Sequence, residues 1–150
     1  MFEDALAGKL KLLWIVGQNP AVTLPNLTLT FDAMAKLEML VVQEIWETET
    51  AACWRRPGVD PKSIATEVIL LPAAFFMEKS GTISNSGGMV QWRHAAVKPP
   101  GEAKSDGEIV DLVFRKVRDL VKDSKEPRDQ IIQKAAWSYT TAEDVLKEIN

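Results

Sequence analysis

The chain has 150 residues, of which 46% are hydrophobic and 26% are charged, and its formal net charge at pH 7 is −3. These values are typical of one globular domain with a real core, and they argue against a basic surface for nucleic acid or anionic lipid. One cysteine and one histidine cannot supply a clustered zinc or iron–sulfur site. No apolar run is long enough to span a bilayer, so we expect no membrane contact by this segment.

Three apolar runs predict the strands of a sheet. After a short amphipathic helix at Phe2–Gly8, Leu12–Val16 is continuously apolar, as expected for a strand buried on both faces of a parallel sheet. Gly17–Pro20 ends that run with turn chemistry. Further strands are predicted at Met39–Val42 and Val68–Leu71. Strands that alternate with helices indicate an α/β fold with an open, mostly parallel Rossmann-like sheet and flanking helices.

The segments between these strands carry helix and loop signals. Thr30 can cap a helix that runs to about Leu37. A short helix is expected near Glu47–Cys53, and the Pro- and Gly-containing stretch Arg55–Thr66 is typical of a surface excursion.

The second half of the chain begins with short extended pieces and becomes helical. Ser105 and Glu108 form the sequence pattern of a capping box, which opens a helix to about Lys122. The remaining predicted elements are extended pieces at Thr82–Asn85 and Met89–Trp92, and helices at Pro127–Trp137 and from about Thr140 to Ile149. We therefore divide the chain into an α/β domain (residues 1–122) and a helical C-terminal extension (residues 123–150).

Polar residues follow the first two predicted strands. Ligands of open α/β sheets bind at the carboxyl ends of the strands, near a topological switch point. Gly17 lets a ligand approach the backbone, and the amide of Asn19 can contact a base edge or a sugar hydroxyl. Glu44 lies 27 residues after Gly17 (44 − 17 = 27), near the place where nucleotide-binding units hold an acid against ribose. The same pattern is common in ordinary turns.

Two charged residues of the second half have both a structural and a functional interpretation. Lys79 is either a solvated turn lysine or a contact for a phosphate. Asp106 lies in a first helical turn, where the helix dipole stabilises an acid, and its carboxylate can also accept two N–H bonds from guanine. Cys53 is expected to be a packed thiol, and His94 to be a loop or surface residue.

The stretch Ile69–Asp106 combines a strand, a Glu-Lys-x-Gly turn, an Asn-Ser-Gly-Gly loop and a Pro-Pro-Gly-Glu segment that opens a helix. This order closely resembles the catalytic (major) subunit of formate dehydrogenases in the molybdenum/tungsten bis-molybdopterin guanine dinucleotide family. Leu12–Val22 and Leu40–Thr50 are similar to two further segments of that family. The resemblance runs from about Met1 to about Val121, and it implies that the α/β domain is incomplete, being only a part of one cofactor-binding domain of that family.

The resemblance implies a pocket for one molybdopterin guanine dinucleotide that carries molybdenum or tungsten. It implies no catalytic residue and no metal ligand in this chain, and the iron–sulfur cluster of the full enzyme would not be bound by this segment. The chain departs from many relatives by having no arginine at Gly87–Met89. The residues that the resemblance assigns to the pocket are Asn19, Gln43, Glu44, Lys79 and Asp106, with Gly17 assigned more weakly.

The resemblance also implies a function and partners. The full enzyme would oxidise formate to CO2, and this segment would associate with the remainder of the catalytic subunit and with an iron–sulfur electron-transfer subunit. The isolated chain is expected to be inactive and to self-associate through exposed apolar surface. Two alternatives remain, a stand-alone guanine-nucleotide-binding module and a non-catalytic assembly module of the same fold. The sequence does not choose between a periplasmic and a cytoplasmic parent enzyme.

The pocket hypothesis makes one spatial prediction. We expect the side chains of Asn19, Glu44, Lys79 and Asp106 to converge along one edge of the sheet.

Overall fold

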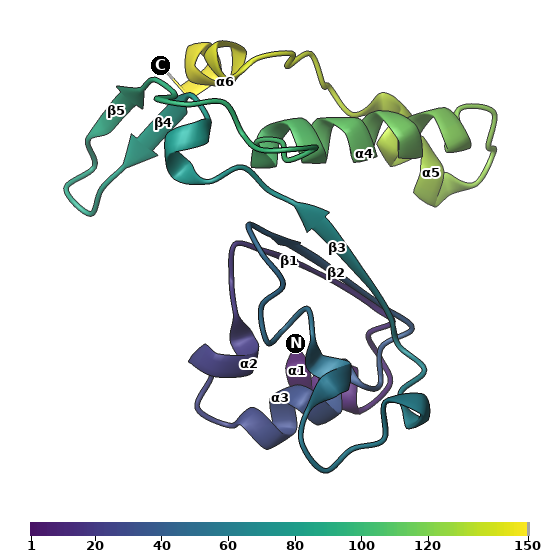
Figure 1. Ribbon diagram of the computed structural model, residues 1–150. Coiled ribbons are helices and arrows are strands. Elements are labelled where there is room, and N and C mark those ends of the chain that lie inside the picture. The colour runs from purple at the N-terminus through teal and green to yellow at the C-terminus, as the bar shows by residue number, and fades with distance from the viewer. Residues whose placement is uncertain (150) are drawn as a thin grey trace. The chain divides into compact units, whose positions relative to one another are not determined.

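The computed structural model describes residues 1–149. The chain divides into two compact units, of which the first comprises Met1–Ala73 and the second begins at Ala74 (Figure 1). The domain boundary at residue 122 that the sequence suggests stays a prediction.

A parallel three-stranded sheet forms the centre of the first unit. Its strands are β1 (Leu12–Val16), β2 (Met39–Glu44) and β3 (Glu67–Pro72), in the order β1-β2-β3. Leu12 pairs with Met39, and Met39 pairs with Glu67, so all three strands end at the same edge. The predicted α/β fold with a parallel sheet is confirmed.

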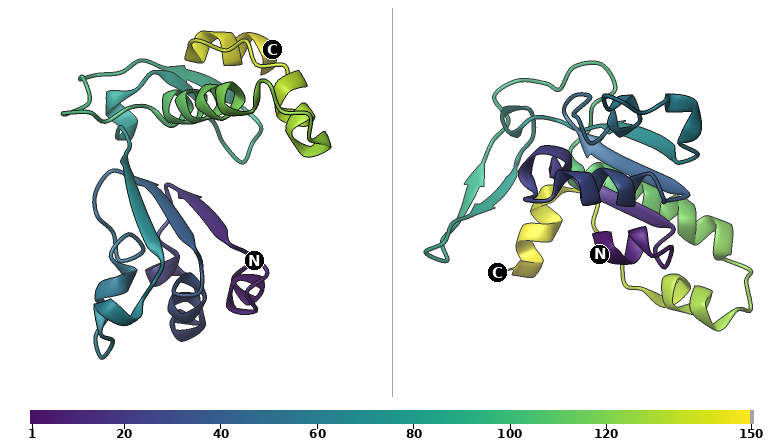
Figure 2. Two further views of the ribbon diagram at one scale, coloured as in Figure 1. Left: turned by 90° about the vertical axis from the view of Figure 1, so that its right-hand side faces the viewer. Right: turned by 90° about the horizontal axis from the view of Figure 1, so that it is seen from below.

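Helices of the first unit lie on one face of this sheet. They are α1 (Phe2–Leu6), α2 (Pro20–Thr23) and α3 (Leu27–Met34), and the views in Figures 1 and 2 agree on their placement. Burial of apolar side chains between two such layers is the main source of stability for a unit of this size. The buried core between the layers includes Ala5, Leu13, Ile15, Ala33, Met34, Leu37, Leu40 and Val42.

The opposite face of the sheet is apolar and partly open. In β1, Leu13 and Ile15 are 7% exposed, whereas Leu12 is 50% and Val16 is 43% exposed. The expectation that this strand is buried on both faces is therefore wrong. Alternate side chains of a strand point to opposite faces, and the helices of this unit cover only one of them.

Two helices of the first unit differ from those that the sequence pattern predicts. Asn26 caps α3, because its Oδ1 accepts a hydrogen bond from the Leu29 N–H at 3.0 Å. Thr30, the predicted cap, is buried inside the helix and donates to the Asn26 carbonyl at 2.8 Å. The helix predicted at residues 47–53 is also wrong, since only a 3₁₀ helix at Cys53–Arg55 forms there, followed by another at Pro61–Ser63.

The second unit begins with a short 3₁₀ helix and an antiparallel hairpin. A 3₁₀ helix at Phe76–Glu78 leads into β4 (Gly81–Ser84), which pairs with β5 (Val90–Arg93). Asn85 shapes the connection, because its Oδ1 accepts from the N–H groups of Gly87 at 2.9 Å and Met89 at 3.2 Å. The two predicted extended pieces are thus the arms of one hairpin.

Three helices complete the second unit, namely α4 (Asp106–Val121), α5 (Pro127–Lys134) and α6 (Ala142–Ile149). The predicted capping box of α4 is confirmed, with the Glu108 carboxylate accepting from the Ser105 N–H at 2.8 Å. α5 stops at Lys134 instead of Trp137, because the following residues turn to pack against α4. Among residues 1–149, no helix is both long and apolar enough to cross a membrane.

Candidate functional site

Gly17 begins the turn that follows β1. Its φ of 58° lies in the left-handed region, which favours glycine, and its N–H donates to the Gln43 carbonyl at 3.0 Å. No other atom lies within 4 Å of the position that a Cβ would occupy. The backbone here is therefore tied to the neighbouring strand and also open to a ligand.

Gln43 and Glu44 end β2 beside this turn. Gln43 is fully buried, whereas Glu44 is half-buried. A carboxylate oxygen of Glu44 accepts from the Ile45 N–H at 2.8 Å, and the Glu44 carbonyl accepts from the Ala73 N–H at 2.9 Å. The strand end thus presents one carboxylate that is partly accessible, at the edge where ligands of parallel sheets bind.

Asn19 lies in the same turn, and its side chain contacts the loop that follows β2. The Asn19 amide donates to the Glu49 carboxylate at 2.7 Å, and its Oδ1 accepts from the Thr50 hydroxyl at 2.7 Å and from the Thr50 N–H at 3.2 Å. Thr50 is fully buried, and its Oγ1 accepts from the Ala21 N–H at 3.1 Å. The Asn19 hydrogen bond lowers the pKa of the Glu49 carboxyl. Sequence reasoning missed Glu49 and Thr50.

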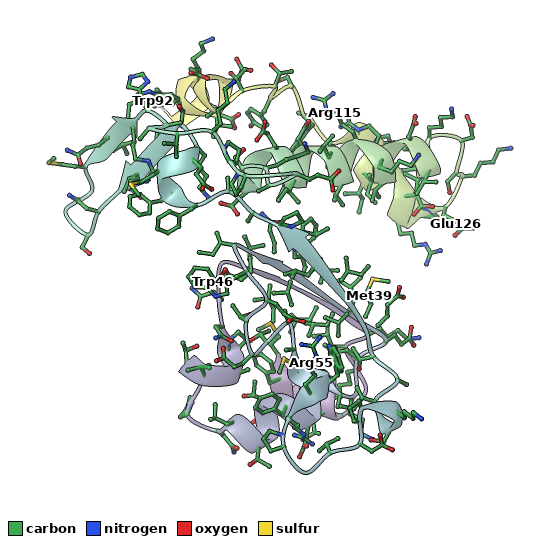
Figure 3. All side chains as sticks on the ribbon, viewed as in Figure 1. Met39, Trp46, Arg55, Trp92, Arg115 and Glu126 are labelled. Carbon is green, nitrogen blue, oxygen red and sulfur yellow. The ribbon has the colours of Figure 1, made fainter. Side chains whose placement is uncertain are left out.

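Trp46 is a further residue that sequence reasoning did not assign to the site. It lies two positions beyond the end of β2 and is 66% exposed. Figure 3 shows Trp46 and Met39 at opposite ends of the sheet, with Trp46 at the carboxyl ends of the strands. An exposed aromatic ring at that edge is available to a planar ligand.

Lys79 and Asp106 form an ion pair in the second unit. Lys79 follows the 3₁₀ helix at Phe76–Glu78, and Asp106 is the first residue of α4. Their side chains are 24% and 40% exposed, so the pair is partly sheltered from solvent. A second carboxylate, that of Glu108, lies at the same helix start. The neighbouring Ser105 hydroxyl and N–H donate hydrogen bonds to it and lower its pKa.

The structure therefore groups the six predicted site residues into two sets. Gly17, Asn19, Gln43 and Glu44 lie together at the strand ends of the first unit, and Lys79 and Asp106 meet in the second unit. The predicted convergence of both sets along one edge stays a prediction.

Cys53 and His94 have the environments that the sequence suggested. Cys53 is 4% exposed, and burial raises the pKa of its thiol. His94 is exposed after β5, and its Nδ1 accepts from the Trp92 indole at 3.4 Å. In the described part of the chain, no group of three or more His, Cys, Asp or Glu side chains could hold a metal ion.

Comparison with known proteins adds to this geometry. Residues 62–116, which include Lys79 and Asp106, match the family model described as molybdopterin oxidoreductase. Formate dehydrogenase subunit alpha of Megalodesulfovibrio gigas is 40% identical over 121 residues, which cover 81% of this chain and 12% of that protein. The chain belongs to the molybdopterin oxidoreductase family.

Two further relatives of this molybdopterin oxidoreductase chain match over most of its length. Formate dehydrogenase 2 subunit alpha (cytochrome c-553) of Nitratidesulfovibrio vulgaris is 43% identical over 87% of the chain and 13% of that protein. The nitrate-inducible formate dehydrogenase major subunit of Escherichia coli K12 is 34% identical over 95% of the chain and 15% of that protein. The chain thus spans only 12% to 15% of the length of these relatives.

Proposed function

We propose that this chain is part of the catalytic subunit of a formate dehydrogenase, where it helps to bind the guanosine and phosphate part of one molybdopterin guanine dinucleotide. The names of the three relatives support the choice of formate. The observation that carries the binding role is the Lys79–Asp106 ion pair at the start of α4, inside the segment that matches the family model.

The chemistry of this pair suits a guanine nucleotide. Guanine presents adjacent N–H donors that a carboxylate such as Asp106 can accept together, and a phosphate needs a cation such as Lys79. A helix start also offers free backbone N–H groups. A nucleotide with both a donor edge and an anionic phosphate could replace the contacts that the two side chains make with each other, without leaving either charge bare.

The strand-end residues of the first unit, considered by themselves, have a chemistry that suits a sugar and a phosphate. Gly17 leaves the backbone open, and Glu44 offers a carboxylate to ribose hydroxyls. Each of the two residue sets, considered by itself, therefore fits a part of the proposed cofactor.

The bound dinucleotide would carry molybdenum or tungsten at its dithiolene end, where formate gives CO2, a proton and two electrons that pass to an iron–sulfur cluster outside this segment. The residues of this chain would contribute by position alone, because they hold the opposite end of the cofactor. We therefore assign no catalytic residue and no metal ligand to the chain.

The test uses the full-length subunit that contains this chain. Lys79→Ala and Asp106→Ala are each expected to reduce the pterin content per protein about tenfold, since a charged hydrogen bond contributes roughly 1.5–3 kcal/mol. Lys125→Ala, which removes an exposed lysine of the same unit, is the matched control. Unchanged pterin content in both pocket variants would show that the assignment is wrong.

A second experiment separates this proposal from a stand-alone nucleotide-binding module. The 150-residue chain alone is titrated with GMP and GDP in a calorimeter, and we expect no measurable heat of binding, because it lacks the rest of the subunit. Tight binding of either nucleotide would favour the stand-alone module. The same preparation is expected to show no formate oxidation.

A further inference from the structure

The side chain of Asn19 is largely used by contacts within the protein. An amide has two donors and one acceptor oxygen. The Asn19 oxygen accepts two hydrogen bonds from Thr50, and one of its two N–H donors is bonded to Glu49 at 2.7 Å. An asparagine that recognised a base edge with both its donor and its acceptor would first have to give up these bonds.

These bonds connect two segments that border the same strand ends. One is the turn after β1, which contains Gly17, and the other is the loop after β2, which carries Trp46. The buried Thr50 hydroxyl continues the chain of bonds, because it donates to Asn19 and accepts from the Ala21 N–H. Such connected bonds strengthen one another and hold a loop in one conformation.

We infer that Asn19 is a positioning residue, which fixes the loop after β2 through Glu49 and Thr50 and supports cofactor binding without contacting the nucleotide. This inference rests on the proposed function of the strand ends. It reassigns Asn19 from the ligand to the loop that shapes the site, and it makes Glu49 and Thr50 its partners.

The test is a rescue experiment in the full-length subunit. Asn19→Asp keeps an acceptor for Thr50 but sets a carboxylate against the Glu49 carboxylate, so pterin content is expected to fall about tenfold, as for one lost charge-assisted hydrogen bond. Adding Glu49→Gln supplies an amide donor to the new carboxylate and is expected to restore the content to within about twofold. Adding Glu47→Gln instead is the matched control and is expected to restore nothing, because Glu47 bonds to Arg55.

A local readout in the 150-residue chain accompanies this test. Hydrogen exchange at the Thr50 N–H is expected to accelerate about tenfold in Asn19→Asp, to recover in the double variant with Glu49→Gln, and to recover in the single variant when acidic pH protonates one of the two carboxylates. This measurement involves no cofactor, so it also shows whether the variants fold.

The outcomes separate the two proposals. If Asn19→Asp leaves pterin content unchanged, or if Glu49→Gln restores Thr50 exchange but not pterin content, the positioning role is wrong. If Lys79→Ala and Asp106→Ala retain full pterin content, the proposed function fails instead. Loss and rescue of pterin content in parallel with Thr50 exchange support the inference.

Discussion

Thr66 joins the end of α3 to the start of β3. It is 8% exposed, and its hydroxyl lies 2.9 Å from the Met34 carbonyl and 2.8 Å from the Leu37 carbonyl. The last carbonyls of a helix have no partner inside the helix, so a buried donor is needed there. The Thr66 hydroxyl is thus shared between two carbonyls of the segment in which the chain leaves α3 and approaches the sheet.

Replacing that hydroxyl tests its contribution to stability. Thr66→Val keeps the volume of the side chain but removes the hydroxyl donor from the Leu37 carbonyl, whereas the Met34 carbonyl keeps its bond from the Leu37 N–H at 3.3 Å, so we expect the free energy of unfolding to fall by about 1–3 kcal/mol. Urea denaturation followed by circular dichroism measures the change. Thr28→Val, at an exposed position of α3, is the control and should change stability by less than about 0.5 kcal/mol.

Two glycines provide a test of backbone conformation in opposite directions. Gly17→Ala places a Cβ at φ 58° without a clash, so the expected cost is the conformational one, about 1–2 kcal/mol. Gly107→Ala, inside α4, has an ordinary φ and open space, and should stabilise by about 0.5–1 kcal/mol. Thermal unfolding of both variants measures these changes in stability. Equal shifts of the melting temperature in the same direction would contradict the explanation.

Residue types at the site could be predicted from the sequence, whereas several of their partners could not. Gly17 and Glu44 follow strands that the apolar runs identify, and so their place at the strand ends follows from the pattern. The role of Asn19 depends on Glu49 and Thr50, which lie 30 and 31 residues away along the chain. No local pattern contains such a partner, and the same holds for the meeting of Lys79 with Asp106.

At the scale of elements, the segment after α5 is attached to α4 by a compact polar and aromatic contact. The Trp137 indole donates to Asp111 at 2.7 Å, and its ring lies 4.6 Å from that of Phe114. Arg115 bonds to Asp111 at 2.8 Å and to the Tyr139 carbonyl at 3.0 Å. Asp111 is therefore the shared acceptor that links the helix to the segment that packs on it.

This contact predicts a dependence on pH. The bonds from Arg115 and Trp137 lower the pKa of Asp111 below its ordinary value of 3.8. Because the folded-state pKa is the lower one, the stabilisation is fully present above the ordinary value and is lost as the pH falls through the folded value. We expect protection of the Trp137 indole N–H, measured by NMR hydrogen exchange, to decrease below about pH 4.

The control for this prediction lies on the same helix. Asp111→Asn can still accept from the indole but has no charge to lose, so the acid-dependent step should disappear. Asp119→Asn, at an exposed position of α4, should retain it. An acid transition that is identical in all three proteins would rule out Asp111 as its source.

Elements with a strong local signal were predicted best. Continuous apolar runs identified all three parallel strands, and the Ser105–Glu108 pair identified the start of α4. Helix ends that depend on contacts with residues far away in the sequence were not predicted correctly. α5 ends early because the Arg118 guanidinium bonds to the Ala135 carbonyl and Trp137 packs on α4, and these contacts offset the local preference for helix.

At the scale of the whole molecule, the open face of the sheet predicts self-association. Leu12 and Val16 expose apolar side chains on the face that the helices of the first unit do not cover. Such a surface attracts a second apolar surface in water. We expect the isolated chain to sediment as a concentration-dependent mixture and to bind a dye that reports exposed apolar surface.

Polar substitution on that face should reduce both signals. The double variant Leu12→Ser, Val16→Thr is expected to lower dye binding and to shift sedimentation towards the monomer. Val22→Thr, which changes an equally exposed valine of α2, should alter neither. A sharp monomer with little dye binding in the unmodified chain would contradict the prediction.

The even spacing of the paired strands has a consequence for synthesis. Leu12 pairs with Met39 and Met39 with Glu67, so successive partners are 27 (39 − 12) and 28 (67 − 39) residues apart. Each strand can dock on its predecessor as soon as it leaves the ribosome, because the loop to be closed is short. The first unit, with Gly17 and Glu44 at its strand ends, can therefore fold before the segment that contains Asp106 has left the ribosome.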